Sequence, residues 1–175
     1  MKKIILITGG QRSGKSMYAE RLALSMTDQP IYFATARIWD EEFKERVKRH
    51  QARRGDNWTN IEEEKYLSHH TIYNKVCVVD CITLWCTNFF FDANQNNPKE
   101  PVIDKALDAI KKEFDQFTAQ DATFIFVTNE IGSGGVSDNV VQRRFTDMEG
   151  WMNQYVASKA DEVVLMVSGI PVKIK

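Results

Sequence analysis

Short apolar runs alternate along this chain with longer stretches in which apolar residues recur every three or four positions. Runs of the length expected for buried strands lie at residues 4–7, 30–36, 76–82, 123–128 and 162–168. Apolar residues at helical spacing predict helices over 17–26, from Pro101 to Phe117, and after Ser137, which can cap the last of them. Strands alternating with helices favour an α/β fold with a mostly parallel sheet and helices on both faces.

The end of the chain departs from this alternation. Gly169 and Pro171 predict a turn after the last apolar run, and residues 172–175 predict the second strand of a C-terminal hairpin. The chain has 175 residues, 43% of them hydrophobic, which is enough to bury one sizeable core. We therefore expect a single domain that spans residues 1–175.

Two polar segments interrupt the pattern and predict loops. Residues 55–65 carry one large aromatic side chain, Trp58, followed by the acidic run 62–64. That run is either a solvated helix start or the source of a carboxylate that accepts hydrogen bonds from a nucleotide. Residues 92–100 hold almost no apolar side chain and predict an exposed loop.

The first apolar run leads directly into the pattern G-x-x-x-x-G-K-S at 9–16, and a predicted helix follows. Gly9, Gly10 and Gly14 let the backbone curl and aim bare N–H groups at phosphate oxygens. Lys15 adds a mobile positive charge, and Ser16 offers its hydroxyl to Mg²⁺. A glycine-rich turn with an incidental Lys-Ser pair is the alternative, but the strand–loop–helix context favours nucleotide binding.

Other polar residues follow the later predicted strands. Asp80 ends the third apolar run, where it either completes a Mg²⁺ site with Ser16 or caps the next helix. Asn129 and Glu130 end the fourth and precede a glycine-rich segment at 132–135, which is either a mobile border of the site or a simple turn. Because carboxyl ends of parallel strands share one edge of a sheet, we expect these residues to converge there.

A third candidate lies in residues 40–54, which predict a mostly polar helix. His50 lies about one turn from Arg46 and about one turn from Arg53 and Arg54. Neighbouring positive charge disfavours the imidazolium form, and a neutral imidazole can be a nucleophile toward phosphorus. The alternative is a solvated basic helix whose histidine is incidental.

Composition excludes several classes of function. The net charge of −1 gives no chain-wide attraction to nucleic acid, and the chain has no run of 18 apolar residues, so we expect no stable membrane insertion. Cys77, Cys81 and Cys86 lack CxxC spacing and predict buried reduced thiols, typical of a cytoplasmic protein. His69 and His70 are adjacent and make a poor metal-binding pair.

The order of the motifs resembles one protein family over nearly the whole chain. The segments that carry the resemblance are GGQRSGKS, YFATARIWDEEFKERVKRHQARRGDNW, DCITLWCTN, VTNEIGSGG and ADEVVLMVSGIPVKIK. They resemble the bifunctional adenosylcobinamide kinase and adenosylcobinamide-phosphate guanylyltransferase of cobalamin biosynthesis. The resemblance implies a RecA-like P-loop NTPase fold and two reactions, phosphorylation of adenosylcobinamide by ATP or GTP and then transfer of GMP from GTP to that phosphate.

The resemblance also implies residue roles and a homotrimer. The residue types themselves predict Lys15 as a second catalytic residue and Mg²⁺ at Ser16 and Asp80. The resemblance assigns the covalent GMP intermediate to His50. The nucleotide contacts that it implies are Gly9, Gly10, Gln11, Arg12, Ser13, Gly14, Lys15, Ser16, Ala34, Thr35, Ala36, Gln51, Ala52, Arg53, Arg54, Glu62 and Asp80.

The chain departs from the family pattern at one place. Ser137, Asp138 and Val140 stand where the family has Pro, Glu and Arg, a difference that concerns corrinoid contacts rather than nucleotide chemistry. Two other classes of function remain open on the residues alone. One is a small-metabolite P-loop kinase without a covalent intermediate, and the other is a nucleotide-dependent regulatory module.

Overall fold

The computed structural model describes residues 1–38, 41, 44–45, 54–97, 99 and 101–175 of the chain. Most of the predicted helix over 40–54 lies outside the described residues. The predicted site residues His50, Gln51, Ala52 and Arg53 also lie outside them.

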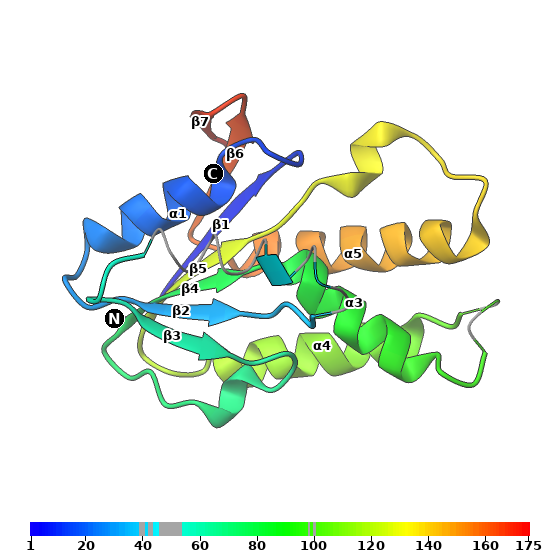
Figure 1. The fold of residues 1–175 in the computed structure, drawn as a ribbon, viewed down its shortest axis with the longest axis horizontal. Coiled ribbons are helices and arrows are strands. Elements are labelled where there is room, and N and C mark those ends of the chain that lie inside the picture. Colours follow the sequence, from blue (N-terminus) through cyan, green and yellow to red (C-terminus); the bar gives the residue numbers. More distant parts are fainter. Residues whose placement is uncertain (39–40, 42–43, 46–53, 98, 100) are drawn as a thin grey trace.

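The described part of the chain contains a seven-stranded sheet in the order β3-β2-β4-β5-β1-β6-β7 (Figure 1). Neighbouring strands pair in parallel, except that β6 and β7 are antiparallel. The mostly parallel sheet and the C-terminal hairpin are therefore confirmed. The strands are β1 (Lys3–Gly9), β2 (Ile31–Ala34), β3 (Thr59–Glu62), β4 (Val76–Asp80), β5 (Thr123–Val127), β6 (Glu162–Val167) and β7 (Ile170–Lys173).

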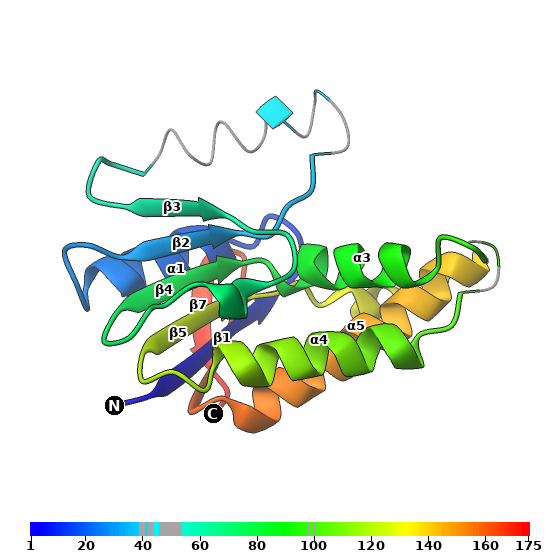
Figure 2. The same ribbon diagram turned by 90° about the horizontal axis from the view of Figure 1, so that it is seen from below.

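Helices cover both faces of this sheet. On one face, α1 (Lys15–Leu24) packs over Ile5 and Ile7 of β1, which lie in a common core with Ala19 and Ala23. On the other face, Ile4 and Leu6 join the core formed with α3 (Ile82–Ala93), α4 (Asp104–Phe117) and α5 (Val140–Lys159). Figure 2 shows these three helices side by side. Because both faces are buried, the central strands read as nearly continuous apolar runs.

The predicted loop at 55–65 is wrong in one respect, because it contains strand β3. Thr59, Asn60 and Glu62 are exposed and only Ile61 is partly buried. An edge strand with most of its side chains in water has no apolar alternation to reveal it. The aromatic side chain before it, Trp58, is buried, with its ring edge-on to that of Tyr32 at 6.0 Å between centroids.

Two helix starts also differ from the prediction. The helix expected from Pro101 begins at Asp104. The long last helix is capped by Asn139 rather than Ser137, because the Asn139 side chain accepts the Gln142 N–H at 3.1 Å. The Ser137 hydroxyl instead accepts the N–H of Asn139 itself, at 3.1 Å. Ser137 therefore stabilises the turn that leads into the cap.

Other expectations concern the buried thiols and the membrane. Cys77, Cys81 and Cys86 are buried and free, as predicted, and burial raises the pKa of each thiol above its ordinary value. They are neutral and unsuited to nucleophilic attack.

None of the helices among the described residues is long and apolar enough to cross a membrane.

Candidate nucleotide-binding site

A cavity of about 730 Å³ lies where strands β1, β2, β4 and β5 end. The predicted convergence is present, because the phosphate loop, Asp80 and the pair Asn129 and Glu130 all line this cavity. The remaining lining residues come from α1, from β2 and the segment after it, from the start of α3, from the end of β5, and from Arg54 and Ile131. The full set is Gln11, Arg12, Ser13, Gly14, Lys15, Ser16, Met17, Tyr32, Ala34, Ala36, Arg54, Asp80, Cys81, Leu84, Val127, Asn129, Glu130 and Ile131.

The phosphate loop adopts a backbone that requires glycine at two positions. Gly9 has φ +147°, and a Cβ there would lie 2.6 Å from the Met166 carbonyl oxygen and 2.9 Å from Ser13 Oγ. Gly14 has φ +93° and occupies the N-cap position of α1. The turn of the C-terminal hairpin supports the loop, since the Gly169 N–H donates to the Ser13 carbonyl at 3.0 Å. The loop is therefore held by β6 and the hairpin as well as by its own sequence.

Lys15 places its ammonium group within the loop. Its Nζ donates to the carbonyl of Gly10, and Ser13 Oγ lies 3.5 Å away. Burial lowers the pKa of Lys15 from its ordinary 10.5, and the nearby Asp80 carboxylate acts in the opposite direction. The first turn of α1 begins at this residue, so the positive end of the helix dipole and the ammonium group attract an anion to the same place.

Asp80 is held by a tyrosine. The Tyr32 hydroxyl donates to Asp80 Oδ2 at 2.7 Å, and burial together with the Asp80 charge raises the pKa of Tyr32 well above its ordinary value. Cys81 rather than Asp80 occupies the N-cap position of α3, so the helix-cap alternative for Asp80 is wrong. Asp80 is therefore free of a capping role and lines the cavity.

The donor set fits Mg²⁺. The Ser16 hydroxyl and the Asp80 carboxylate supply oxygen ligands within one cavity, and Mg²⁺ in such sites takes one or two protein ligands and completes its shell with phosphates and water. Within the described ranges no three His, Cys, Asp or Glu side chains gather in a metal cluster. An ion here would therefore depend on the nucleotide for its remaining ligands.

Arg54 forms the wall of the cavity next to Asp80. Its guanidinium carbon lies 3.5 Å from the centre of the Tyr32 ring, the same tyrosine that binds Asp80. Its Nε donates to Asn60 Oδ1 at 2.7 Å, and its Nη1 lies 3.5 Å from Glu20 Oε1 of α1. A buried guanidinium with these contacts is fixed in position. Sequence reasoning placed Arg54 at the site but did not foresee the stack on Tyr32.

The segment after β2 divides its side chains between the cavity and the core. Ala34 and Ala36 line the cavity, whereas Thr35 is fully buried and does not. The Thr35 hydroxyl donates to the Cys81 carbonyl at 2.8 Å and lies 2.9 Å from the Cys81 N–H, which donates to it. Glu62 pairs in register with Ala34 but is exposed and does not line the cavity. Of these four predicted contacts, Ala34 and Ala36 line the cavity, and Thr35 and Glu62 do not.

The segment that carries His50 is flanked by two residues of the cavity rim. Ala36 precedes it and Arg54 follows it, and both line the cavity. Arg37 anchors the first end, since it donates to Asp92 at 2.8 Å and to Glu64 at 2.7 Å. Described residues on both sides of His50 in the chain therefore border the cavity.

Sequence reasoning missed a buried carboxyl group behind the site. Glu149 of α5 is 1% exposed, and its Oε1 accepts the Thr83 hydroxyl at 2.9 Å. Thr83 Oγ1 in turn accepts the backbone N–H of Asn129 at 3.0 Å and its side-chain Nδ2 at 3.2 Å. Burial raises the pKa of Glu149 to about 7. In the sequence, a charged residue next to Met148 on an amphipathic helix looks like a surface position, and no motif marks it.

Comparisons with known proteins agree with this geometry. Residues 5–174 match the family model described as "Cobinamide kinase / cobinamide phosphate guanyltransferase". A relative from Escherichia coli (strain K12), the "Bifunctional adenosylcobalamin biosynthesis protein CobU", is 38% identical over 98% of this chain and 99% of its own. The "Bifunctional adenosylcobalamin biosynthesis protein CobP" of Pseudomonas aeruginosa is 34% identical over 97% of this chain and 96% of its own.

Solved structures bear on the fold alone. An ATPase from the type III secretion system of pathogenic bacteria has a TM-score of 0.58 at 11% identity and covers 94% of this chain and 51% of its own. A second solved structure, also of an ATPase domain, has a TM-score of 0.50 at 13% identity and covers 94% of this chain and 69% of its own. The predicted RecA-like P-loop NTPase fold is thereby confirmed.

Replacing Gly9 with alanine should lower the free energy of unfolding by about 1–3 kcal/mol, because the new Cβ forces the backbone out of a positive-φ conformation against β6. Gly10→Ala is the matched control, since a Cβ at Gly10 meets no atom within 4 Å. Urea unfolding without nucleotide measures both. An equal loss in the two variants would contradict the role of the Gly9 contact with Met166.

Glu149→Gln should flatten the pH dependence of stability. The folded-state pKa of about 7 lies above the ordinary value of 4.5, so the contribution of Glu149 is present below pH 4.5 and is lost as the pH rises through about 7. Glutamine does not titrate, so the variant should lose less stability than the wild type between pH 5 and pH 8. Urea unfolding at both pH values measures this, with the exposed Asp138→Asn as control. Equal slopes in the wild type and Glu149→Gln would refute the assignment.

Proposed function

The chain belongs to the cobinamide kinase / cobinamide phosphate guanyltransferase family, and we propose that it catalyses both reactions named in that description. The first is phosphorylation of adenosylcobinamide by ATP or GTP, and the second is transfer of GMP from GTP to adenosylcobinamide phosphate, with loss of pyrophosphate. The observation that carries the proposal is a nearly full-length family match whose phosphate loop, Lys15 and Asp80 meet at one cavity.

In the kinase step, the residues of this chain bind and orient the nucleotide phosphates. The loop backbone and the start of α1 offer N–H groups to phosphate oxygens, and the Lys15 ammonium neutralises charge that develops on the leaving group. Mg²⁺ held by Ser16 and Asp80 would supply further charge neutralisation. Tyr32 keeps the Asp80 carboxylate oriented toward this task through its 2.7 Å hydrogen bond.

In the guanylyltransferase step, His50 is the proposed nucleophile. A neutral imidazole nitrogen attacks the α-phosphorus of GTP, a nitrogen–phosphorus bond forms, and pyrophosphate departs with the electron pair of the broken phosphoanhydride bond. A phosphate oxygen of adenosylcobinamide phosphate then attacks the same phosphorus, and the histidine nitrogen leaves. Support for this assignment comes from Ala36 and Arg54, which flank the His50 segment and line the cavity.

The guanidinium groups near His50 in the sequence have a further use. Arg54 is buried against the cavity, so its charge faces any nucleotide bound there with little screening. Positive charge at this wall stabilises the phosphates of a bound nucleotide. We also propose, from the family resemblance, that the protein is a cytoplasmic homotrimer.

His50→Ala should abolish covalent labelling of the protein by α-labelled GTP in the presence of Mg²⁺, because the residue that bonds to phosphorus is gone. Adenosylcobinamide phosphorylation by ATP should persist, since that step uses the phosphate loop. Mass spectrometry of the wild type should find one added GMP, acid-labile and base-stable as a phosphoramidate.

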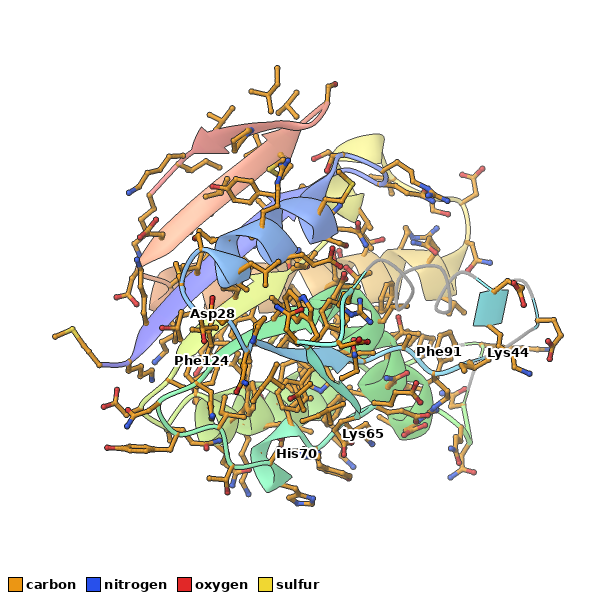
Figure 3. All side chains as sticks on the ribbon, turned by 60° about the vertical axis from the view of Figure 1, so that its left-hand side comes forward. Asp28, Lys44, Lys65, His70, Phe91 and Phe124 are labelled. Atoms are coloured by element: carbon orange, nitrogen blue, oxygen red, sulfur yellow. The ribbon has the colours of Figure 1, made fainter. Side chains whose placement is uncertain are left out.

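His69→Ala is the control, because His69 is exposed, stacks on Tyr66 and does not line the cavity. Its neighbour His70, labelled in Figure 3, lies with it on the segment that packs against α4. The control should retain full labelling. Persistent labelling of His50→Ala would overturn the nucleophile assignment, and absence of labelling in the wild type would favour a kinase without a covalent intermediate.

A further inference from the structure

A second hollow of about 540 Å³ lies beside the nucleotide cavity, between the short 3-10 helix η2 (Ile131–Gly134) and α5. The two spaces adjoin along the chain, because Ile131 lines the cavity and the next residue, Gly132, lines the hollow. Figure 1 shows the segment around η2 arching from the end of β5 over α5. We call this hollow the η2–α5 groove. Consecutive residues of one segment therefore border the nucleotide cavity and the groove.

The side chains of the groove combine apolar surface with hydrogen-bonding groups. Val136, Val140 and Trp151 line it and are 87%, 42% and 47% exposed. Arg144 and Gln154 line it as well and are exposed. Large apolar side chains gathered in an exposed hollow commonly mark a binding site. A ligand suited to this surface has a flat apolar ring system that packs against Trp151. It also has polar groups at its edge that can hydrogen-bond to Arg144 and Gln154.

The groove wall has a fixed shape. Arg143 Nη1 donates to the Ser137 carbonyl at 2.8 Å and ties the loop to α5. Asn139 caps α5 through the N–H of Gln142 at 3.1 Å, which holds the other side of the same turn. A pre-formed wall lowers the entropic cost of binding a ligand.

Adenosylcobinamide, the acceptor in the proposed kinase step, has both the apolar surface and the polar groups that suit the groove. Adenosylcobinamide is a broad macrocycle fringed with carboxamide groups, and only its aminopropanol arm takes part in the reaction. The nucleotide phosphates occupy the cavity at the loop, and the arm must reach them while the ring rests on a surface beside the nucleotide. On the basis of the proposed function, we infer that the η2–α5 groove binds the macrocycle. The aminopropanol arm then passes over Ile131 to reach the nucleotide phosphates.

Gly150 allows a steric test without removing any contact. It lies in α5, lines the groove, and a Cβ at this position meets no atom within 4 Å. Gly150→Phe should therefore fill the groove, whereas the matched control Gly150→Ala adds one methyl group to open space. We expect Gly150→Phe to raise the KM for adenosylcobinamide by about tenfold or more, with the KM for ATP unchanged within about twofold. The control should leave both constants unchanged.

A second variant keeps the inference testable should Gly150→Phe fail to fold. Trp151→Ala removes an exposed side chain, and it should raise the corrinoid KM about three- to tenfold while ATP KM stays constant. Covalent GMP labelling needs no corrinoid, so full labelling of both variants shows that the nucleotide site is intact.

The possible results separate the inference from the function on which it rests. If the wild type does not phosphorylate adenosylcobinamide, the proposed function fails. If the wild type is active and both variants keep its corrinoid KM, the groove assignment fails alone. A changed molar mass of Gly150→Phe in light scattering, with corrinoid KM unaltered, would identify the groove as a subunit contact and would also overturn the inference.

Discussion

The close approach of the phosphate-loop backbone to β6 constrains the rest of the site. Gly9 has no room for a Cβ against the Met166 carbonyl, and the loop beyond it is held by the hydrogen bond from Gly169 to Ser13. Strand β1 must therefore lie beside β6, with β5 on its other side. This order brings Glu130, whose N–H donates to the Gly9 carbonyl at 3.1 Å, to the edge of the same loop. The C-terminal hairpin is thus part of the phosphate site although its residues line none of it.

Two groups of charged side chains hold Arg37 and Arg54, the described arginines before and after His50 in the chain. Arg37 and Lys65 both contact Asp92, and the Arg37 hydrogen bonds are the chief cause that lowers the pKa of that carboxyl to about 2. At the other end, Arg54 lies between Tyr32 and Glu20. Exposed ion pairs contribute little to stability, but a buried guanidinium with several partners fixes geometry. Arg37 is therefore fixed to α3, and Arg54 to β2 and α1.

Sequence patterns predicted the elements whose structure depends on their own residues alone. Strands buried on both faces appear as apolar runs, and the phosphate loop appears as glycines at fixed spacing, because each feature depends on its own residues. The edge strand β3 escaped prediction since three of its four side chains are in water. The stack of Arg54 on Tyr32 and the burial of Glu149 against Thr83 escaped because each depends on packing between distant segments. The family resemblance supplied site roles that the residues alone left open.

The arrangement around the cavity explains how one phosphate loop can serve two reactions. In the sheet order, β2 lies on one side of β4 and β5 on the other, so Ala36 and Arg54 approach from the β2 side and Ile131 from the β5 side. Ala36 and Arg54, the described cavity residues before and after His50 in the chain, lie on the first side, and the η2–α5 groove lies on the second. Under the proposed function, the nucleophile and the corrinoid arm would approach a nucleotide held by the loop from these two sides. Ser137 and Val140, where we expect the family to carry proline and arginine, line the groove and not the nucleotide cavity. Under the further inference, variation there would change acceptor contacts while the phosphate chemistry stays the same.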